Sequence, residues 1–505
     1  MLKKQDKKRK KEDLMGNGYK SLLKATIVMS GAQIIEALMS IVRAKVIALL
    51  LGPIGIALNS IFLITLNTLY QVTSMGLPQS AIRDIAQSQN SENPIEQQKI
   101  ISAFRTLIRL LAVITFLFCI FAAPVLSNIS FGVANNHTTD FMILSVGACA
   151  MLLSYGNTTI LQGMQRLNAL AQTTIFAAIS SVIIAIPLLY FFNHKGVSLA
   201  ISCGFIITFI INSLYVKRLS IKRIRLSWNE VWTIGSPMIK LGIIIMFSSL
   251  LMNLFTYLTN ILIRFFGSIE DVGYFQAAYS ITMRNFSILA ATLIADFYPR
   301  LSKALDNKKE FNNIVSEEAE LLIILISIVS VILILFTKPI LWLLLSAEFY
   351  SIELLTQCIT FSLLFRIMWA TLSYIPLAHG DKKMYLIYDA LLGNGGNFII
   401  TIVAYYLFGL NGIGFAMIIG NLFVSLLLYF VYKKHYGMEF NNSFWKLQSI
   451  YIVLLGLFMS TLFVRDSSLY YVANIILLVI FTFFSYRELN NRIDIKQFIK
   501  SKFHK

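Results

Sequence analysis

The sequence feature that most constrains the fold is a series of fourteen long apolar runs. A helix of about 20 apolar residues crosses the ~30 Å hydrocarbon core of a bilayer. Only 13% of the residues are charged, about half the usual fraction in soluble domains. The runs predict an all-α polytopic membrane protein with about fourteen transmembrane helices, at 24–50, 56–77, 104–126, 140–161, 171–192, 197–216, 237–264, 271–297, 319–345, 352–378, 384–408, 412–432, 449–464 and 469–486.

The distribution of basic residues predicts how these helices are oriented. Loops on the cytoplasmic side of a membrane protein carry an excess of Lys and Arg. Both tails and the alternate loops together hold 31 of the 43 Lys and Arg, whereas the opposite loops hold three. We therefore expect both termini on the cytoplasmic side, and an even number of spans agrees with this orientation.

The first six spans and the next six form an internal duplication. Gly196 and Lys217 recur as Gly412 and Lys433, both shifted by 216 residues. Because six is even, both copies enter the membrane from the same face, as in parallel-repeat transporters. We expect two six-helix bundles around a central cavity and an additional C-terminal helix pair. The predicted divisions are a basic cytoplasmic N-tail at 1–20, an N-terminal bundle at 21–225, a C-terminal bundle at 226–436, the extra helix pair at 449–487 and a basic cytoplasmic C-tail at 488–505.

The sequence contains no pattern that indicates an enzyme or a cofactor site. The segment 16–21 has the composition of a phosphate-binding loop but not its spacing. The four Cys are isolated within apolar spans, and no two His are four residues apart, so we expect neither a metal nor a cofactor. A nucleic-acid partner is excluded as well, because such a protein carries its basic residues on a solvated surface.

Nine Lys and Arg fall at membrane depth, where only a few acidic residues accompany them. Ionisable groups there are costly and usually line a water-filled cavity. We expect four of them, Lys24, Arg105, Arg109 and Lys240, to extend from span ends to the interface. Arg binds phosphate groups with planar, bidentate geometry. The remaining cations predict a phosphorylated, anionic substrate, and the candidates to bind its diphosphate are Arg43, Arg284, Lys45, Arg264 and Arg366.

An alternative for two of these arginines is internal neutralisation, of Arg43 by Glu36 and of Arg366 by Asp389. Polar residues at steps of three and four also form stripes on spans 1, 2, 7 and 8. We expect the stripes to face a central cavity; the alternative is hydrogen bonding between helices, about 0.6 kcal/mol each. The sugar-contact candidates are Gln33, Asn67, Asn253, Tyr257, Asn260 and Gln276, and the ion-coupling candidates are Glu36 and Asp296.

Three segments of the chain resemble bacterial oligosaccharide flippases. They are RAKVIALLLGPIG at 43–55, MGLPQSAIRDIA at 75–86 and FYPRLS at 297–302. The chain is similar there to the O-antigen and enterobacterial-common-antigen flippases, the polysaccharide transporter branch of the multidrug/oligosaccharidyl-lipid/polysaccharide exporter superfamily. The similarity is strongest over about 20–90 and 260–305, and the pattern of spans extends it to about 435.

This resemblance implies a flippase that moves an undecaprenyl-diphosphate-linked oligosaccharide, of O-antigen or capsule type, from the inner to the outer leaflet of the bacterial cytoplasmic (inner) membrane by alternating access. It implies a cavity lined by spans 1, 2, 7 and 8, with Arg43 and Arg284 at positions where the family carries cavity cations, and glycan polymerases or ligases as partners. The extra helix pair is similar to that of lipid II flippases. A lipid II-type flippase is therefore one alternative. A multidrug–cation antiporter of the same superfamily is the other alternative, and it would need carboxylates in its cavity.

Overall fold

The computed structural model describes residues 2–88, 94–133, 135–219, 221–222, 224–461 and 468–492. Side chains are described from residue 28 on, except at 30, 94, 244–245, 248–249, 251–252, 285, 288, 291–296, 299 and 468–469 within these ranges. Within these ranges the chain forms helices and turns and no β-strand, as the sequence predicts. The helices form two compact units, Met1–Tyr257 (unit 1) and Leu258–Lys505 (unit 2).

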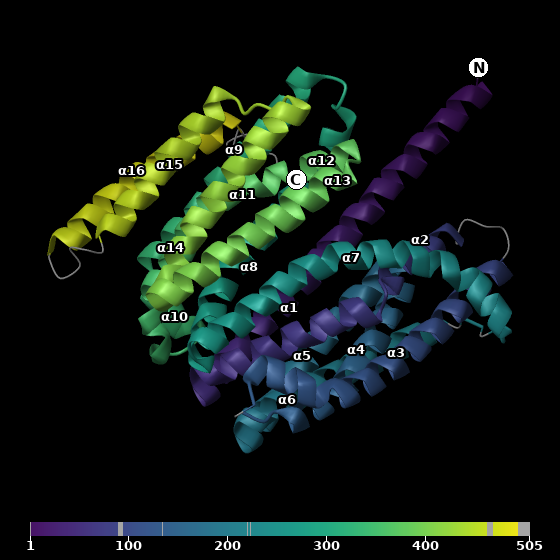
Figure 1. Cartoon of the computed structure of the whole chain (residues 1–505). Helices are drawn as coiled ribbons and strands as arrows, with labels where there is room; N and C mark the ends of the chain where they lie inside the picture. Colours follow the sequence, from purple (N-terminus) through teal and green to yellow (C-terminus); the bar gives the residue numbers. More distant parts are fainter. Residues whose placement is uncertain are drawn as a thin grey trace. The chain divides into compact units, whose positions relative to one another are not determined.

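Unit 1 is organised around α4, which packs against both α3 and α6, while α5 packs against α1 and α6 (Figure 1). Small residues allow these close approaches. A Cβ added at Gly156 of α4 would lie 2.8 Å from Cγ2 of Ile108 on α3. The elements of unit 1 are α1 (Leu2–Thr73), α2 (Leu77–Ser88), α3 (Pro94–Phe131), α4 (Thr138–Gly163), α5 (Leu167–Phe192), the 3₁₀ turn η1 (Asn193–Lys195), α6 (Gly196–Arg218) and the first part of α7 (Trp228–Phe266).

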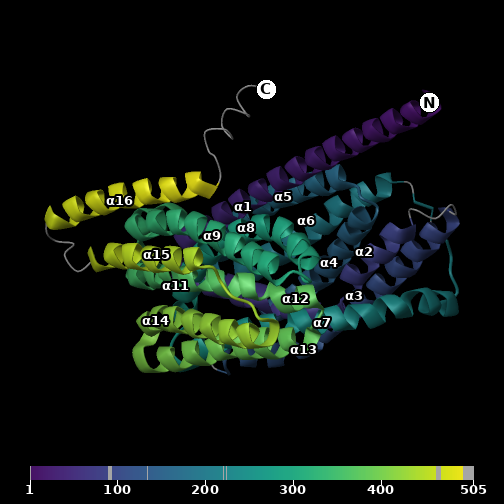
Figure 2. The same ribbon diagram turned by 90° about the horizontal axis from the view of Figure 1, so that it is seen from above.

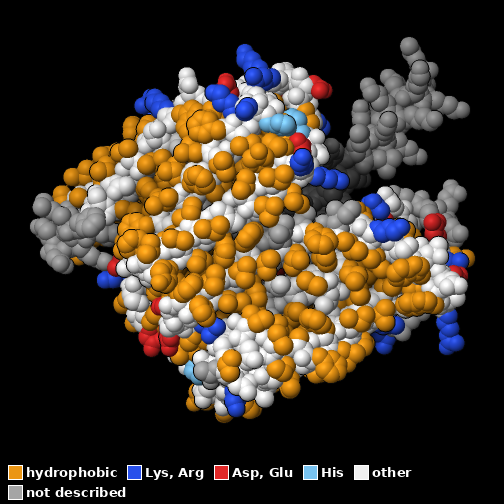
Figure 3. All heavy atoms as spheres, in the orientation of Figure 1, with side chains coloured by type: hydrophobic (Ala, Val, Ile, Leu, Met, Phe, Trp, Pro, Cys, Tyr) orange, Lys and Arg blue, Asp and Glu red, His pale blue; other side chains and the backbone are white. Residues whose placement is uncertain are grey.

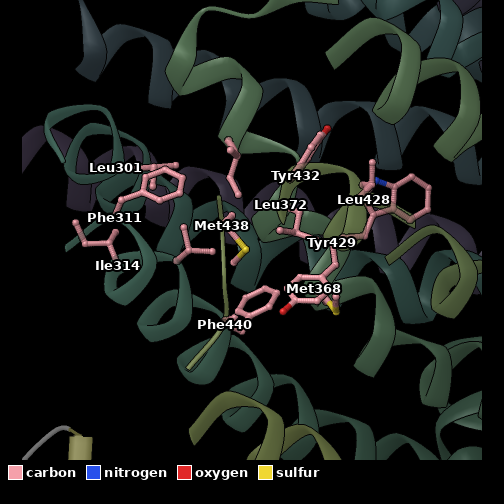
Figure 4. Close-up of a cluster of buried hydrophobic side chains, with 14 of the residues drawn as sticks. Leu301, Phe311, Ile314, Met368, Leu372, Leu428, Tyr429, Tyr432, Met438 and Phe440 are labelled. Atoms are coloured by element: carbon pink, nitrogen blue, oxygen red, sulfur yellow. The ribbon is translucent and has the colours of Figure 1, made fainter. Parts of the chain in front are cut away.

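Unit 2 contains the rest of α7, and its long helices α9, α11, α14 and α15 run along a common direction (Figure 2). One of its core clusters consists of aromatic and aliphatic side chains mainly from α8, α9, α11 and α14, including Phe311, Met368 and Tyr432 (Figure 4). The elements are α8 (Ile269–Lys303), α9 (Lys308–Leu335), α10 (Thr337–Leu344), η2 (Ala347–Ile352), α11 (Glu353–Leu372), α12 (Tyr374–His379), α13 (Lys382–Met384), the π-helix η3 (Tyr385–Gly393), α14 (Asn394–Tyr436), α15 (Asn442–Ser460) and α16 (Ser468–Arg492).

The extra C-terminal helix pair, α15 and α16, belongs to unit 2. α15 packs on α9 and α11, and α16 contacts α15 and α9. Tyr451 of α15 is fully buried and its hydroxyl donates to Ser485 of α16 at 3.1 Å. Arg492 at the end of α16 donates to Glu320 of α9 at 2.8 Å and to Glu488 at 2.6 Å. The pair is therefore fixed to the second bundle by apolar packing and by one ionic cluster.

Three helical hairpins share one tight turn. Its first residue has positive φ and strongly negative ψ: 60°, −154° at Gly52; 51°, −130° at Asn193; and 63°, −153° at Gly409. This region is nearly restricted to glycine. Each turn has a second glycine three residues later, where a Cβ would overlap the preceding helix. The second glycines of the latter two turns, Gly196 and Gly412, are the residues that the internal duplication pairs.

The described residues contain nine helical segments that are long and apolar enough to cross a membrane. Three of them, Gly31–Thr73, Leu167–Arg218 and Lys382–Tyr436, each contain two predicted spans joined by the tight turn. The predicted spans 237–264 and 271–297 correspond to α7 and α8. Hydrophobic side chains cover most of the visible face of the molecule, with Lys and Arg mainly near its margins (Figure 3). The predicted all-α polytopic membrane fold is confirmed.

The boundary between the two units falls within α7, after Tyr257. The duplication predicts a boundary at 225/226, in the loop that precedes this helix. The first part of α7 packs into unit 1 through a close backbone approach: a Cβ added at Gly242 would lie 2.8 Å from the carbonyl carbon of Gly76. Gly76 itself has φ of +62° and forms the turn between α1 and α2. The long α7 therefore contributes to both units.

Candidate functional site

A polar cavity of about 360 Å³ lies within unit 1, between α1, α4, α5 and α6. We call it the arginine cavity, after Arg43. Eleven of its lining residues carry hydroxyl, amide or charged groups, and they come from all four helices. These residues are Glu36, Ser40 and Arg43 from α1, Ser154, Tyr155 and Thr158 from α4, Thr173, Thr174 and Ser181 from α5, and Thr208 and Asn212 from α6.

The α1 wall of the arginine cavity follows from the spacing of its residues. Glu36, Ser40 and Arg43 are separated by four and three residues, so they lie on one face of the helix. Gln33, one turn earlier in the same predicted stripe, is exposed and does not line the cavity. The stripe on span 1 therefore marks a cavity wall over two turns.

Arg43 presents an incompletely satisfied guanidinium to this cavity. One of its Nη groups donates to Asn59 Oδ1 at 3.4 Å, which is long for such a bond. Its Nε is buried and has no hydrogen-bond partner among the described residues. Leaving a buried donor unpaired costs about 1–3 kcal/mol. The unused N–H of Arg43 is therefore available to donate to an acceptor.

The predicted counter-ion, Glu36, lines the same cavity but is exposed in its own right. The cavity therefore carries one carboxylate and one guanidinium, rather than only cations. A carboxylate and an arginine on one wall can serve two ligands, an anion at Arg43 and a cation or proton at Glu36.

A second polar cavity, of about 320 Å³, lies beside the first. We call it the amide cavity. Tyr155 and Thr158 line both cavities, and the ring of Tyr155 packs against that of Tyr70 at 4.7 Å between centroids. The two cavities thus form one continuous polar lining within unit 1. The amide cavity takes its name from Asn67, Gln71, Gln79 and Gln162, and it includes the sugar-contact candidate Asn67.

Sequence reasoning missed the contribution of α4, α5 and α6. A signal for them exists, because Gly204, Thr208 and Asn212 are four residues apart, and Ser154 and Thr158 have the same spacing. Most hydroxyls in membrane helices donate to a carbonyl one turn earlier, so this signal is weak. Thr208 indeed donates to the Gly204 carbonyl at 2.7 Å while it lines the cavity.

The other four candidate cations are not among the lining residues of the arginine cavity. Lys45 and Arg264 are half-buried, and the Nε of Arg264 has no hydrogen-bond partner among the described residues. Arg284 is exposed at the middle of α8. Of the five candidate cations, only Arg43 is among the lining residues of the arginine cavity or of the amide cavity.

Arg366 belongs to a buried cluster in unit 2. Its guanidinium lies over the ring of Trp369 at 3.7 Å. The Trp369 indole N–H donates to Asp389 at 2.7 Å, and the hydroxyl of Ser373 donates to the same carboxylate. Asp389 lies on the π-helix η3, whose extra residue per turn brings this carboxylate toward α11. Arg366 and Asp389 thus both contact Trp369, and neutralisation of the arginine by this carboxylate stays a prediction.

The stripes on α7 and α8 make contacts between helices. The amide of Gln276 donates to Asn260 at 2.6 Å, and Asn260 is only 1% exposed. The hydroxyls of Tyr257 and Ser130 are 2.9 Å apart, which links α7 to α3 within unit 1. This geometry favours interhelical hydrogen bonding at these positions. Asn253 is half-buried, and the side chain of Asp296 lies outside the described residues.

Comparison with solved structures shows which proteins share this fold. The chain is similar to the lipid II flippase MurJ in an inward closed conformation, with a TM-score of 0.65 and 17% identity over 92% of this chain and 99% of that one. It is also similar to an outward-facing multidrug resistance MATE family transporter of the MOP superfamily, with a TM-score of 0.56 and 16% identity over 82% and 95%. A MOP superfamily transporter from Pyrococcus furiosus gives 0.54 and 16% over 82% and 94%.

Sequence comparison identifies the family. Comparison with curated proteins gives no match. Residues 22–305 match the family described as polysaccharide biosynthesis protein. The matched segment includes α1 from residue 22 on and all residues that line the two polar cavities. Because it also makes up more than half of the sequence, the chain belongs to the polysaccharide biosynthesis protein family.

Proposed function

We propose that the chain is a flippase for an undecaprenyl-diphosphate-linked oligosaccharide, of O-antigen or capsule type. It moves the head group from the inner to the outer leaflet of the bacterial cytoplasmic membrane and has both termini in the cytoplasm. The observation that carries the proposal is Arg43, whose buried Nε lacks a hydrogen-bond partner among the described residues while the side chain lines a polar cavity. Membership of the polysaccharide biosynthesis protein family supports a glycan substrate.

Arg43 holds the diphosphate in this proposal. A phosphate oxygen accepts the unused N–H groups of the guanidinium, and such charge-assisted bonds are about twice as strong as neutral ones. The other hydrogen bond of this side chain, to Asn59, is long and readily exchanged for a ligand. The lipid chain stays in the bilayer, because only the head group needs a polar path.

The sugars occupy the rest of the polar lining. Hydroxyl and amide groups both donate and accept, so they can pair with sugar hydroxyls in several orientations. The arginine cavity supplies mainly hydroxyls, and the amide cavity supplies Asn67, Gln71 and Gln162. Because Tyr155 and Thr158 line both, an oligosaccharide can extend from one cavity into the other.

Glu36 supports a second candidate, a multidrug–cation antiporter on the same fold. Its carboxylate lines the arginine cavity, and the multidrug resistance MATE transporters share the fold. In the flippase proposal, Glu36 instead couples transport to an ion. The two functions differ in which side chain is indispensable for binding: Arg43 for an anionic lipid, Glu36 for a cationic compound.

The test uses cells that depend on this chain for surface glycan. Charged hydrogen bonds of about 1.5–3 kcal/mol correspond to a loss of about 10–150-fold when they are removed. We expect this loss of glycan export for Arg43→Gln and a partial loss for Arg43→Lys, which keeps the charge but not the planar fork. The control is Arg225→Gln, an exposed loop residue of the same unit. Full export by Arg43→Gln, together with efflux of cationic dyes that Glu36→Gln abolishes, would establish the antiporter instead.

A further inference from the structure

A third pocket, of about 470 Å³, lies within unit 1 between α3, α4 and α6. We call it the basic pocket. α4 packs against both other helices (Figure 1), and its residues Gly156 and Asn157 line the pocket. Arg105 and Arg109 of α3 form one wall, and Ser213 and Lys217 of α6 form the other. None of its lining residues lines the arginine cavity or the amide cavity.

The polar groups of the basic pocket are suited to an anion. Its lining contains three cations and neither Asp nor Glu. The amide of Asn157 donates to the hydroxyl oxygen of Ser213 at 2.8 Å, so the proton of that hydroxyl can be donated elsewhere. Arg109 and Lys217 are exposed, which leaves their charged ends accessible. A phosphate group satisfies these donors, whereas the ammonium group of a zwitterionic lipid finds no carboxylate.

The surroundings of the pocket are suited to a lipid. The chain after α6 folds back on α3, since the Ile224 N–H donates to Ser102 at 3.2 Å, and Ile221 from this segment lines the pocket. On the parts of α3 and α6 that lead away from this segment, the exposed side chains next to the pocket are apolar. Val113 on α3 is 55% exposed and Leu214 on α6 is 53% exposed. The pocket therefore combines a basic end with an apolar surface that hydrocarbon chains can cover.

The position along the membrane normal follows from the basic loop. Lys217 ends α6 and is followed by Arg218, Lys222 and Arg225. Such loops lie on the cytoplasmic side, where the leaflet carries anionic lipids and basic pockets between helices bind their head groups.

We propose that the basic pocket binds an anionic phospholipid of the cytoplasmic leaflet. Arg109, Lys217 and the Ser213 hydroxyl hold its phosphate, Arg105 adds positive charge, and the acyl chains lie along the apolar faces of α3 and α6. This lipid is a resident of the first bundle, separate from the lipid-linked glycan that is transported.

The experiment measures lipid retention by the purified full-length chain with native mass spectrometry. Phosphatidylglycerol is compared with phosphatidylcholine of the same acyl chains. Each cation near the surface contributes about 1 kcal/mol, or about five-fold in affinity. We expect Arg109→Gln and Lys217→Gln each to weaken phosphatidylglycerol binding about five-fold, and the double variant about 30-fold. Arg218→Gln is the matched control, because this neighbouring residue lies over Tyr215 instead of lining the pocket.

Three results would overturn the proposal. The first is equal retention of the two lipids by the wild-type chain. The second is unchanged phosphatidylglycerol binding in the Arg109→Gln and Lys217→Gln variants. The third is protection against heat by inorganic phosphate alone at millimolar concentration, which would assign the pocket to a free anion. If the double variant does not fold, the five-fold effect of each single variant decides the question, and intact glycan export by these variants separates the lipid site from the transport site.

Discussion

Replacing Gly412 by alanine tests the tight turn that joins the two halves of α14. The turn begins at Gly409, and Gly412 starts the second helix directly against the first. A Cβ added at Gly412 would overlap the carbonyl oxygen of Ala404 and would lie 2.8 Å from the Cβ of Phe408. The obstacle includes a backbone atom, so rotation of a side chain cannot relieve it, and the two helices must separate.

The expected cost of this substitution is about 3 kcal/mol, at the upper end of overpacking in a well-packed site. The higher helix propensity of alanine offsets about 1 kcal/mol of this cost. A net loss of about 2 kcal/mol lowers the melting temperature by about 4 °C in a unit of about 250 residues. The assay is thermal unfolding of the detergent-purified chain, followed by fluorescence-detected size-exclusion chromatography.

Gly396→Ala in the same helix is the matched control. A Cβ at Gly396 would meet no other atom within 4 Å, so we expect stabilisation by up to about 1 kcal/mol from helix propensity. The two substitutions therefore have opposite signs. A melting temperature of Gly412→Ala equal to that of the wild type would contradict the close approach of the two helices at this turn.

Three further predictions concern other parts of the chain. Asn193→Gly should raise the melting temperature, because Asn193 has a strained backbone conformation that glycine adopts freely. Such strain costs about 1–3 kcal/mol. An unchanged melting temperature would contradict the strain at this position. Arg492→Ala should cost about 3–5 kcal/mol, because it leaves the carboxylate of Glu320 largely buried and unpaired, and it should expose α16 to limited proteolysis. The backbone N–H of Met384 donates to Asp381 and, as the main cause, lowers the pKa of that carboxyl. The stabilisation by Asp381 is present above the unfolded pKa and is lost as pH falls through the lower folded value, so Asp381→Asn should flatten the acid limb of a stability–pH profile.

The fold could be predicted from the sequence because each apolar run is long enough to indicate a membrane-spanning helix. The paired positions Gly196 and Gly412 predict the duplication, and the structure places both at the same step of a tight turn. The turn itself could not be predicted, because its first residue is Asn193 in one hairpin and Gly409 in the other. Two different residue types share that backbone geometry, and only the packing of the adjoining helices shows it.

The candidate site could be predicted in part. The spacing of Glu36, Ser40 and Arg43 predicts a shared face, and all three line one cavity. Asn260 and Gln276 belong to equally regular stripes on α7 and α8, yet their side chains hydrogen-bond to each other. Spacing identifies a polar face but not whether water or a neighbouring helix covers it. That distinction depends on which helices pack together.

The π-helix around Asp389 also lies beyond sequence reasoning. The Asp389 carboxylate accepts hydrogen bonds from Trp369 of α11 and from Ser373, the residue after α11, and both lie 16 or more positions away in the sequence. The sequence predicts that Arg366 and Asp389 lie near each other, because their spans are consecutive. The sequence does not predict the stacking of Arg366 on Trp369, since this contact depends on the side-chain conformation.

The most direct test of the proposed function is translocation by the purified chain in proteoliposomes. The vesicles contain a fluorescent polyprenyl-diphosphate oligosaccharide, and a membrane-impermeant lectin reports how much reaches the outer surface. We predict transfer that depends on Arg43, because this residue lines the arginine cavity and its buried Nε has no hydrogen-bond partner among the described residues. Arg43→Gln should reduce the rate about ten-fold or more, whereas Arg225→Gln should not. Equal transfer by vesicles with and without the chain would contradict it.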